Sequence, residues 1–455
     1  MTDRTIAGVQ PGGEAEAGRP RRPAWLKAAV GAFLAFELVA AAVLLGGKDR
    51  TDGTAPPAPR PAAARPRAEA PRADAVRERA DAVRRLLDTR ARAITRRDRH
   101  TFARTLDRTR PRFVQSQLAM FDALAAVPVS AWHYDLHDDG DVTPTTYGVE
   151  AWAPRVTLRY RLTGFDDEPP AVPQFFTFTR RDGGWVTASD SDYDTDPHRR
   201  TGRELWDFGP VAVARGSRSL VLGRPGQATL LRDVARLADA AVPRVTKVWG
   251  TRWSQRVVIL VPSSQREVSR ILGDDTDLSR IAAVAVAELP GDTGERAVGN
   301  RIIVNPQTFR RLGTNGRRVV LTHETAHVAT RDASRPGIPT WLVEGFADYV
   351  GYLGTGLSPR AICQELAADV RAGRAPVNLP ADDAFSGAND HLAQAYESSW
   401  LAVRMIAERV GEQGLVRFYD AAGRDGAETA MREALGTTPD TFVRAWRNYL
   451  RTTLG

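Results

Sequence analysis

The chain has 455 residues, a length that allows two or three domains and at least one large apolar core. Its 63 lysine and arginine residues against 55 aspartate and glutamate residues give a formal net charge of +8. The sequence has no dense basic face with interleaved aromatic residues, which argues against nucleic acid as a partner. The single cysteine, Cys363, excludes an intramolecular disulfide and a zinc site made of cysteines. Only three of the basic residues are lysine, and we interpret this bias as that of a GC-rich, actinobacterial genome.

The N-terminal part of the sequence predicts a tail followed by a membrane anchor. Residues 1–24 are polar and rich in Gly and Pro, which is typical of disordered segments. Residues 25–47 are apolar apart from Lys27 near their start and Glu37, and as a helix they are long enough to cross a bilayer core of about 30 Å. Basic residues cluster more densely before this stretch than after it. We therefore expect a single-pass membrane protein with a cytoplasmic tail and its bulk outside the cytoplasm.

Residues 48–73, rich in Pro, Ala and Arg, predict an extended linker between the anchor and the folded part of the chain. A cleaved signal peptide is the alternative to the anchor, because the small residues Ala40 and Ala42 resemble a cleavage site. The apolar stretch is long for a signal peptide, so we favour the uncleaved anchor.

Residues 74–195 predict a small α+β domain. A charged helix follows the linker, with apolar residues at helical spacing from Val76 onwards, and a second helix is expected at 112–124. Strand-like segments separated by turns then follow at 127–136, 147–162, 174–181 and 184–189. This layout, with its closing hairpin Asp182-Gly183-Gly184-Trp185-Val186, resembles a nuclear-transport-factor-2-like domain, which is a cone with one curved sheet.

Residues 203–455 predict a second α+β domain, in which a sheet is followed by helices. Strands are expected at 211–215, 219–223, 256–261, 283–289 and 300–305. An amphipathic helix is expected at 228–249 and a shorter one at 263–272, and helices dominate after residue 305.

The motif that carries chemistry is Leu-Thr-His-Glu-Thr-Ala-His-Val at 321–328. His323 and His327 are four residues apart in a helical stretch, so both imidazoles project from one face and can bind the same Zn²⁺ ion. Glu324 does not lie on that line and flanks the open coordination position, where a carboxylate can accept a proton from the attacking water. Histidines that only cap or pack are the alternative. We disfavour it because the motif uses two of only seven histidines at a fixed spacing.

A catalytic zinc site requires a third protein ligand, and the segment Trp-Leu-Val-Glu-Gly-Phe-Ala-Asp-Tyr at 341–349 supplies it. We expect a helix with Thr340 as its N-cap and with the third ligand, Glu344, in its first turn. Asp348 follows on the same face and suits a carboxylate that hydrogen-bonds a ligand histidine and fixes its tautomer. Gly345 is expected to let this helix approach the motif helix closely. An exposed polar stripe is the alternative, and the apolar residues around the two carboxylates argue against it.

His-Glu-x-x-His followed by Trp-Leu-x-Glu-Gly-x-Ala-Asp resembles the gluzincin clan of zinc metallopeptidases, in particular its peptidase-MA-like group, over residues 205–455. The resemblance implies a mixed sheet ahead of the motif helix, with an edge strand that binds substrate backbone in an extended form. Residues 300–305 are the expected edge strand. The resemblance also implies a tyrosine or histidine that stabilises the oxyanion, for which Tyr396 is the first candidate and His391 the second.

Together these features predict a membrane-anchored zinc endopeptidase that hydrolyses peptide bonds of an extracytoplasmic protein or peptide. The 16 residues between His327 and Glu344 are fewer than in the large aminopeptidases of the clan, and no amine-anchoring glutamate motif occurs. Two alternatives stay open: a catalytically silent binding or scaffold protein of the cell envelope, and a zinc hydrolase of a non-peptide envelope component. The intact Glu324 counts against the first, because a structural zinc site does not need that group.

Overall fold

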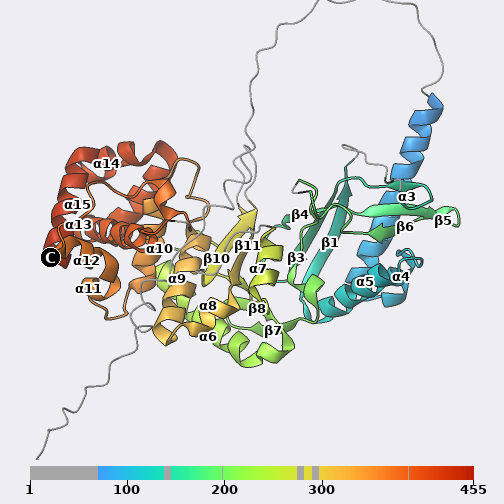
Figure 1. Cartoon of the computed structure of the whole chain (residues 1–455), viewed down its shortest axis with the longest axis horizontal. Helices are drawn as coiled ribbons and strands as arrows, with labels where there is room; N and C mark the ends of the chain where they lie inside the picture. Colours follow the sequence, from blue (N-terminus) through green and yellow to red (C-terminus); the bar gives the residue numbers. More distant parts are fainter. Residues whose placement is uncertain are drawn as a thin grey trace, which may run out of the picture.

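The computed structural model describes residues 70–137, 144, 146–196, 198–273, 281–288, 297–387 and 389–455. The predicted tail, the predicted anchor at 25–47 and nearly all of the predicted linker lie outside these residues. Within the described part of the chain, no helix is both long and apolar enough to cross a bilayer. Figure 1 shows an elongated molecule, with the first helices and strands at one end, a sheet in the middle and the last helices at the other end. The described chain is α+β, as predicted.

The middle region has its helices first and its strands second, in the predicted order. Its elements are α3 (Ala70–Thr95), α4 (Arg99–Arg104), α5 (Pro111–Ala123), η1 (Leu124–Ala126), β1 (Val129–Leu136), β2 (Ala151–Trp152), β3 (Val156–Leu162), β4 (Ala171–Gln174), β5 (Thr177–Arg181) and β6 (Gly184–Ser189). The described strands form two three-stranded antiparallel sheets, β1-β3-β4 and β2-β5-β6, where one curved sheet was expected. The expected strand at 147–162 is divided into β2 and β3 because Pro154, which has no N–H to donate, lies between them. The nuclear-transport-factor-2-like resemblance stays a prediction.

A five-stranded mixed sheet with the order β10-β11-β9-β8-β7 forms the centre of the molecule. The elements of this part are η2 (Leu205–Phe208), β7 (Ala212–Arg215), β8 (Ser219–Gly223), η3 (Pro225–Gln227), α6 (Ala228–Trp249), β9 (Val257–Leu260), α7 (Gln265–Leu272), β10 (Ala283–Glu288), β11 (Val298–Val304) and α8 (Pro306–Arg311). β8, β9 and β11 run parallel to one another, whereas β7 and β10 are antiparallel to their neighbours.

The prediction that residues 300–305 form the edge strand is wrong. β11 lies inside the sheet, between β10 and β9, and β10 is the edge strand on that side. β10 precedes β11 in the sequence and folds back against its outer side as an antiparallel partner. Strand order is a long-range property, so the apolar pattern of 300–305 did not reveal this partner.

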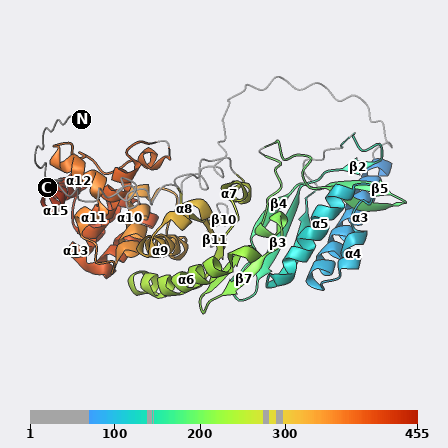
Figure 2. The same ribbon diagram turned by 60° about the horizontal axis from the view of Figure 1, so that its bottom comes forward.

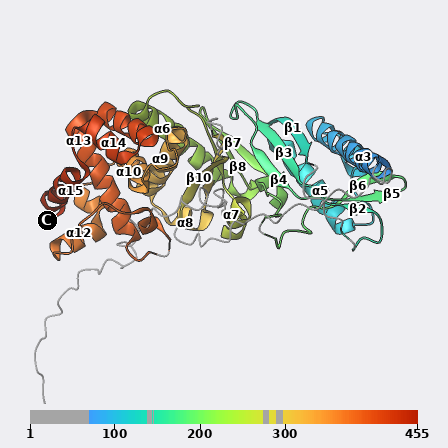
Figure 3. The same ribbon diagram turned by 90° about the horizontal axis from the view of Figure 1, so that it is seen from above.

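Both faces of the central sheet are covered. Side chains alternate between the two faces along each strand. One set packs against α6 and α9, namely Val221, Val257, Ile259, Ile302 and Val304. The other set packs with α7 and with the middle region, namely Leu220, Leu222, Val258, Leu260 and Ile303. Figures 2 and 3 show α6 on one side of the sheet and α7 on the other. The middle region therefore shares one continuous apolar core with the central sheet.

Buried polar contacts add to this shared core. The guanidinium of Arg301, on β11, donates to both carboxylate oxygens of Asp166 in the middle region, at 2.7 and 2.8 Å. The hydroxyl of Tyr160, on β3, donates to Glu204 at 2.7 Å, just before η2. Burial raises the pKa of Glu204 to about 7 and that of the neighbouring Asp207 to about 6. These contacts join the middle region to the central sheet and to the segment that connects the two.

The remaining helices form the far end of the molecule. They are α9 (Thr314–Thr330), α10 (Thr340–Tyr352), α11 (Pro359–Ile362), α12 (Gln364–Arg371), η4 (Asp382–Phe385), α13 (Leu392–Asp425), α14 (Ala427–Leu435) and α15 (Pro439–Leu454). α13 consists of two helical parts joined at Gly411, whose φ is 74°. α10 lies between α9 and α13, and its buried apolar residues join the core of this end.

Candidate metal centre and active site

Helix α9 brings the His-Glu-x-x-His motif into the interior of the protein. Every residue from Val319 to Thr330 is buried, because the helix contacts α6, α10 and the edge strand β10. Both motif histidines are almost completely enclosed: His323 is 2% and His327 3% exposed. Buried imidazoles need polar partners to offset the loss of water, so their surroundings decide what the motif can do.

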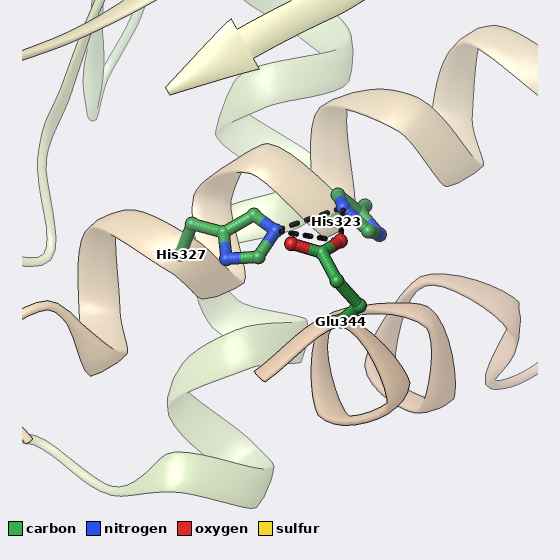
Figure 4. Close-up of side chains that lie close together, drawn as sticks. All are labelled: His323, His327 and Glu344. Atoms are coloured by element: carbon green, nitrogen blue, oxygen red, sulfur yellow. Dashed lines mark hydrogen bonds and ion pairs between the residues drawn. The ribbon is translucent and has the colours of Figure 1, made fainter. Parts of the chain in front are cut away.

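The structure brings together the three predicted ligands, His323, His327 and Glu344. The Nε2 atoms of the two histidines are 2.8 Å apart, with the rings nearly perpendicular at 72°. The Oε2 atom of Glu344 lies 3.4 Å from Nε2 of His323 and 3.6 Å from Nε2 of His327. Figure 4 shows the carboxylate of Glu344, from α10, pointing at the two rings from α9.

These three atoms fit a zinc ion by their chemistry and by their spacing. In a tetrahedral site with bonds of about 2.0–2.1 Å, ligand atoms are separated by about 3.3 Å. The two distances to Glu344 agree with this value, and the distance of 2.8 Å between the histidines would open slightly. Two imidazole nitrogens and a carboxylate oxygen that face one another away from water repel unless a positive charge lies between them. Within the described residues, His323, His327 and Glu344 form the one group of this kind that could hold a metal.

Asp348 occupies the predicted position behind His323. The Nδ1–H of His323 donates to Oδ1 of Asp348 at 2.9 Å, which leaves the lone pair of Nε2 directed toward His327 and Glu344. Burial would lower the pKa of His323, but the hydrogen bonds to Asp348 and Glu344 outweigh it and raise that pKa well above its usual value. Carboxylates that stabilise a positive charge on this imidazole would equally stabilise a metal dication beside it.

Glu324 lies in the same buried environment and is 4% exposed. Its negative charge is close enough to His323 to contribute to the raised pKa of that imidazole. It does not belong to the group of possible metal ligands. Its role as a base that acts on a water stays a prediction.

Two details of helix α10 differ from the predictions. The N-cap is Pro339 and not Thr340, which is the first helical residue, so Glu344 lies beyond the first turn. The backbone N–H of Thr340 donates to the side chain of Asp382 at 2.9 Å. A carboxylate 42 residues later in the chain thus caps the helix, and no local sequence signal reveals it.

The close approach of α10 to the motif helix occurs at Gly351, not at Gly345 as predicted. A Cβ atom on Gly351 would lie 3.2 Å from the carbonyl oxygen of Val319 on α9. Gly345 instead faces α13, where a Cβ atom would lie 2.5 Å from the carbonyl oxygen of Ser399. Two small residues on different sides of α10 therefore set the position of the helix that carries Glu344.

The two candidates for the oxyanion donor lie in different surroundings. Tyr396 is 4% exposed, lies on α13 one turn before Ser399, and packs edge-on against Phe385 with ring centroids 5.3 Å apart. His391 is exposed at the start of α13, where its backbone N–H donates to Asn389 at 2.9 Å. Tyr396 is therefore a buried residue on α13, the helix that contacts α10. The role of either residue stays a prediction.

Sequence reasoning missed Arg331, the C-cap residue of α9. Its guanidinium Nη2 donates to the backbone carbonyl of Ala285 on the edge strand β10 at 2.8 Å. The available signal was its spacing: it follows His327 by four residues, as His327 follows His323.

No protein-family model matches the chain, and no curated protein matches it. Among solved structures, a variant of an M1 zinc metallopeptidase from Deinococcus radiodurans, bound to a Tyr-Ser-Ala substrate, aligns with a TM-score of 0.32 and 15% identity. The alignment covers 59% of this chain and 58% of that one. A two-domain M1 zinc metallopeptidase variant bound to L-arginine aligns with a TM-score of 0.32 and 13% identity, over 70% of this chain and 83% of that one. Since this chain spans little more than half the length of the first of these structures, the function proposed below depends on the geometry of the site itself.

Proposed function

We propose that the protein is a zinc-dependent peptidase that hydrolyses internal peptide bonds of a protein or peptide substrate. The observation that carries the proposal is the buried group of His323, His327 and Glu344, with the carboxylate of Glu324 beside it and Asp348 behind His323. A structural zinc site needs four protein ligands and no base, whereas a catalytic site has three ligands and an open position. The described residues supply three ligands and one candidate base.

The three ligands would hold Zn²⁺, which when bound lowers the pKa of a water to about 7 and polarises a carbonyl oxygen. Glu324 then accepts the proton of the attacking water and delivers it to the amine that leaves. Asp348 keeps the Nδ1–H of His323 engaged and so presents Nε2 as the ligand atom. Tyr396 donates its hydroxyl to the developing oxyanion. Its burial favours it over the exposed His391.

The edge strand β10 supports a peptide as the substrate. An extended chain adds to a sheet along its edge strand, and β10 is the edge strand of the described sheet next to the motif helix. The short spacing between the second histidine and Glu344 and the lack of an amine-anchoring glutamate motif favour an endopeptidase. We further propose that residues 25–47 anchor the chain in the cell membrane, with the catalytic part outside the cytoplasm.

The test uses the full-length chain in detergent, loaded with zinc after treatment with a chelator. We expect one zinc per chain, and cleavage of internally quenched peptides from a mixed-sequence library. Glu324→Gln should keep the zinc and lose most of the activity, because general-base catalysis contributes about 10²–10⁴-fold. Glu428→Gln, at an exposed position on α14, is the matched control and should leave both unchanged.

The two alternatives give different results in this test. A silent scaffold would bind zinc and cleave nothing, and a hydrolase of a non-peptide envelope component would cleave isolated envelope material but no peptide of the library. Cleavage by Glu324→Gln at the parental rate would show that Glu324 is not the base.

A further inference from the structure

Arg331 lies on the same stripe of α9 as the two histidine ligands. His323, His327 and Arg331 are spaced by four residues, and Arg331 has helical dihedral angles (φ −49°, ψ −49°) as the C-cap of the helix. Residues at this spacing project from one helix face. The guanidinium therefore lies one turn beyond the metal ligands, on the side where α9 contacts β10.

The pairing of β10 shows which of its backbone groups face outward. Asn305 N–H donates to the Ala282 carbonyl at 2.9 Å, so these two residues form a hydrogen-bonded pair of the antiparallel ladder. Hydrogen-bonded pairs alternate along such a ladder, and the pairs Ala283↔Val304 and Ala285↔Ile302 are therefore of the other type. The N–H and C=O groups of Ala283 and Ala285 thus point away from β11, toward the edge of the described sheet. A substrate strand that adds to β10 would pair with these groups.

One of these outward groups already accepts a hydrogen bond from Arg331. Its Nη2 donates to the Ala285 carbonyl at 2.8 Å, so a substrate strand that continues along the edge reaches the guanidinium at this point. A strand that pairs with Ala285 must replace or accommodate Arg331.

The charge of Arg331 is not matched by an opposite charge among the described residues. Within the described residues, no carboxylate forms an ion pair with it, and its Nε is buried without a hydrogen-bond partner. The side chain of its neighbour Asp332 accepts the N–H of Ala297 at 3.2 Å. A guanidinium has five N–H donors in a planar fork that matches a carboxylate. A buried donor without a partner is costly, and a substrate carboxylate would satisfy it.

We propose, on the basis of the peptidase function above, that Arg331 binds a carboxylate of the substrate beside the metal centre. The preferred substrates then carry a carboxylate close to the scissile bond. An acidic side chain and the C-terminal carboxylate of the substrate share this chemistry, and the test separates them. Arg331 acts here as a specificity-determining residue and takes no part in proton transfer.

The test measures binding, so that it does not depend on turnover. The zinc-loaded full-length chain with Glu324→Gln is titrated with fluorescent peptides in matched pairs, Glu against Gln at each position in turn and free C-terminal carboxylate against amide. We expect the carboxylate member of at least one pair to bind roughly 10- to 100-fold more tightly, which is typical of a hydrogen-bonded charge. Arg331→Gln should reduce this ratio to near one, Arg331→Lys should keep part of it, and Arg335→Gln, at an exposed position four residues later, should keep all of it.

The outcomes separate this inference from the proposed function. The position of the effective Glu identifies a side-chain carboxylate, and an effect confined to the free C-terminus identifies a terminal one; both support the inference. If the parental chain cleaves peptides but no pair differs, or if Arg331→Gln keeps the ratio at full zinc content, Arg331 is not the anchor and the peptidase function stands. If no peptide is bound by any variant or cleaved by the parental chain, both proposals fail.

Discussion

Replacing Gly345 with alanine tests whether the contact between α10 and α13 positions the metal centre. The new Cβ would lie 2.5 Å from the carbonyl oxygen and 2.8 Å from the carbonyl carbon of Ser399. These atoms belong to the backbone, so they cannot rotate away and the two helices must separate. Overpacking of this kind costs about 1–3 kcal/mol, whereas alanine gains about 1 kcal/mol over glycine inside a helix. We expect a net loss of up to about 2 kcal/mol.

The assay compares thermal unfolding of the metal-free chains with zinc affinity. A loss of about 2 kcal/mol lowers the melting temperature by about 4–8 °C, at about 2–4 °C per kcal/mol for a domain of 150–250 residues. Zinc affinity should fall as well, because Glu344 directly precedes the substituted residue and ligand distances in metal sites tolerate only about 0.2 Å. Gly226→Ala is the control, since a Cβ there meets no atom within 4 Å. If Gly345→Ala were as stable as this control and bound zinc equally tightly, the contact with Ser399 would not position the site.

Five further substitutions test the site and its surroundings. His323→Ala and His327→Ala should each lose the metal, as measured by elemental analysis, and full zinc occupancy in both would contradict their assignment as ligands. Asp348→Asn should weaken zinc binding by about 10–100-fold in a competitive chelator titration, because the carboxylate behind His323 is lost; unchanged affinity would remove it from the site. Tyr396→Phe should lower kcat by about 10²–10³-fold with KM nearly unchanged, whereas a lower melting temperature with intact kcat would make Tyr396 a packing residue. Glu204→Gln should gain stability relative to the parental chain as the pH rises from 5 to 8. Glu204 has a raised pKa of about 7, so the folded state retains a proton that the unfolded state loses at lower pH. The stabilisation that this proton gives the parental chain is complete below about pH 4 and is lost as the pH rises through 7. A pH-independent difference between the two chains in urea unfolding would contradict this account.

The local features of the fold follow closely from the sequence. α6 begins and ends at the predicted residues, because its apolar residues keep a helical period and Gly250, with φ of 98°, stops it. The strands β6 and β8 also agree with their predicted bounds. The predicted ligands His323, His327 and Glu344 meet because two helices with short-range signals present them.

The features that escaped prediction depend on contacts between distant parts of the chain. The position of β11 inside the sheet is set by its pairing with both β9 and β10. The cap of α10 is Asp382, and the glycine that faces the motif helix is Gly351. The contact of Arg331 with the outward carbonyl of Ala285 depends on how β10 pairs with β11, so it could not be predicted from the position of Arg331 in the sequence. None of these relations is visible in a local pattern of residues.

The apolar core that joins the middle region to the central sheet has a consequence for how the catalytic part could be released or isolated. A fragment that begins at residue 203 would expose the sheet face formed by Leu220, Leu222, Val258, Leu260 and Ile303, and we expect it to aggregate. A protease that cuts between the two regions would leave two pieces held together by that core and by the pair of Arg301 with Asp166. If residues 25–47 form the membrane anchor proposed above, release of the folded part in one piece would therefore require a cut before α3, which begins at Ala70.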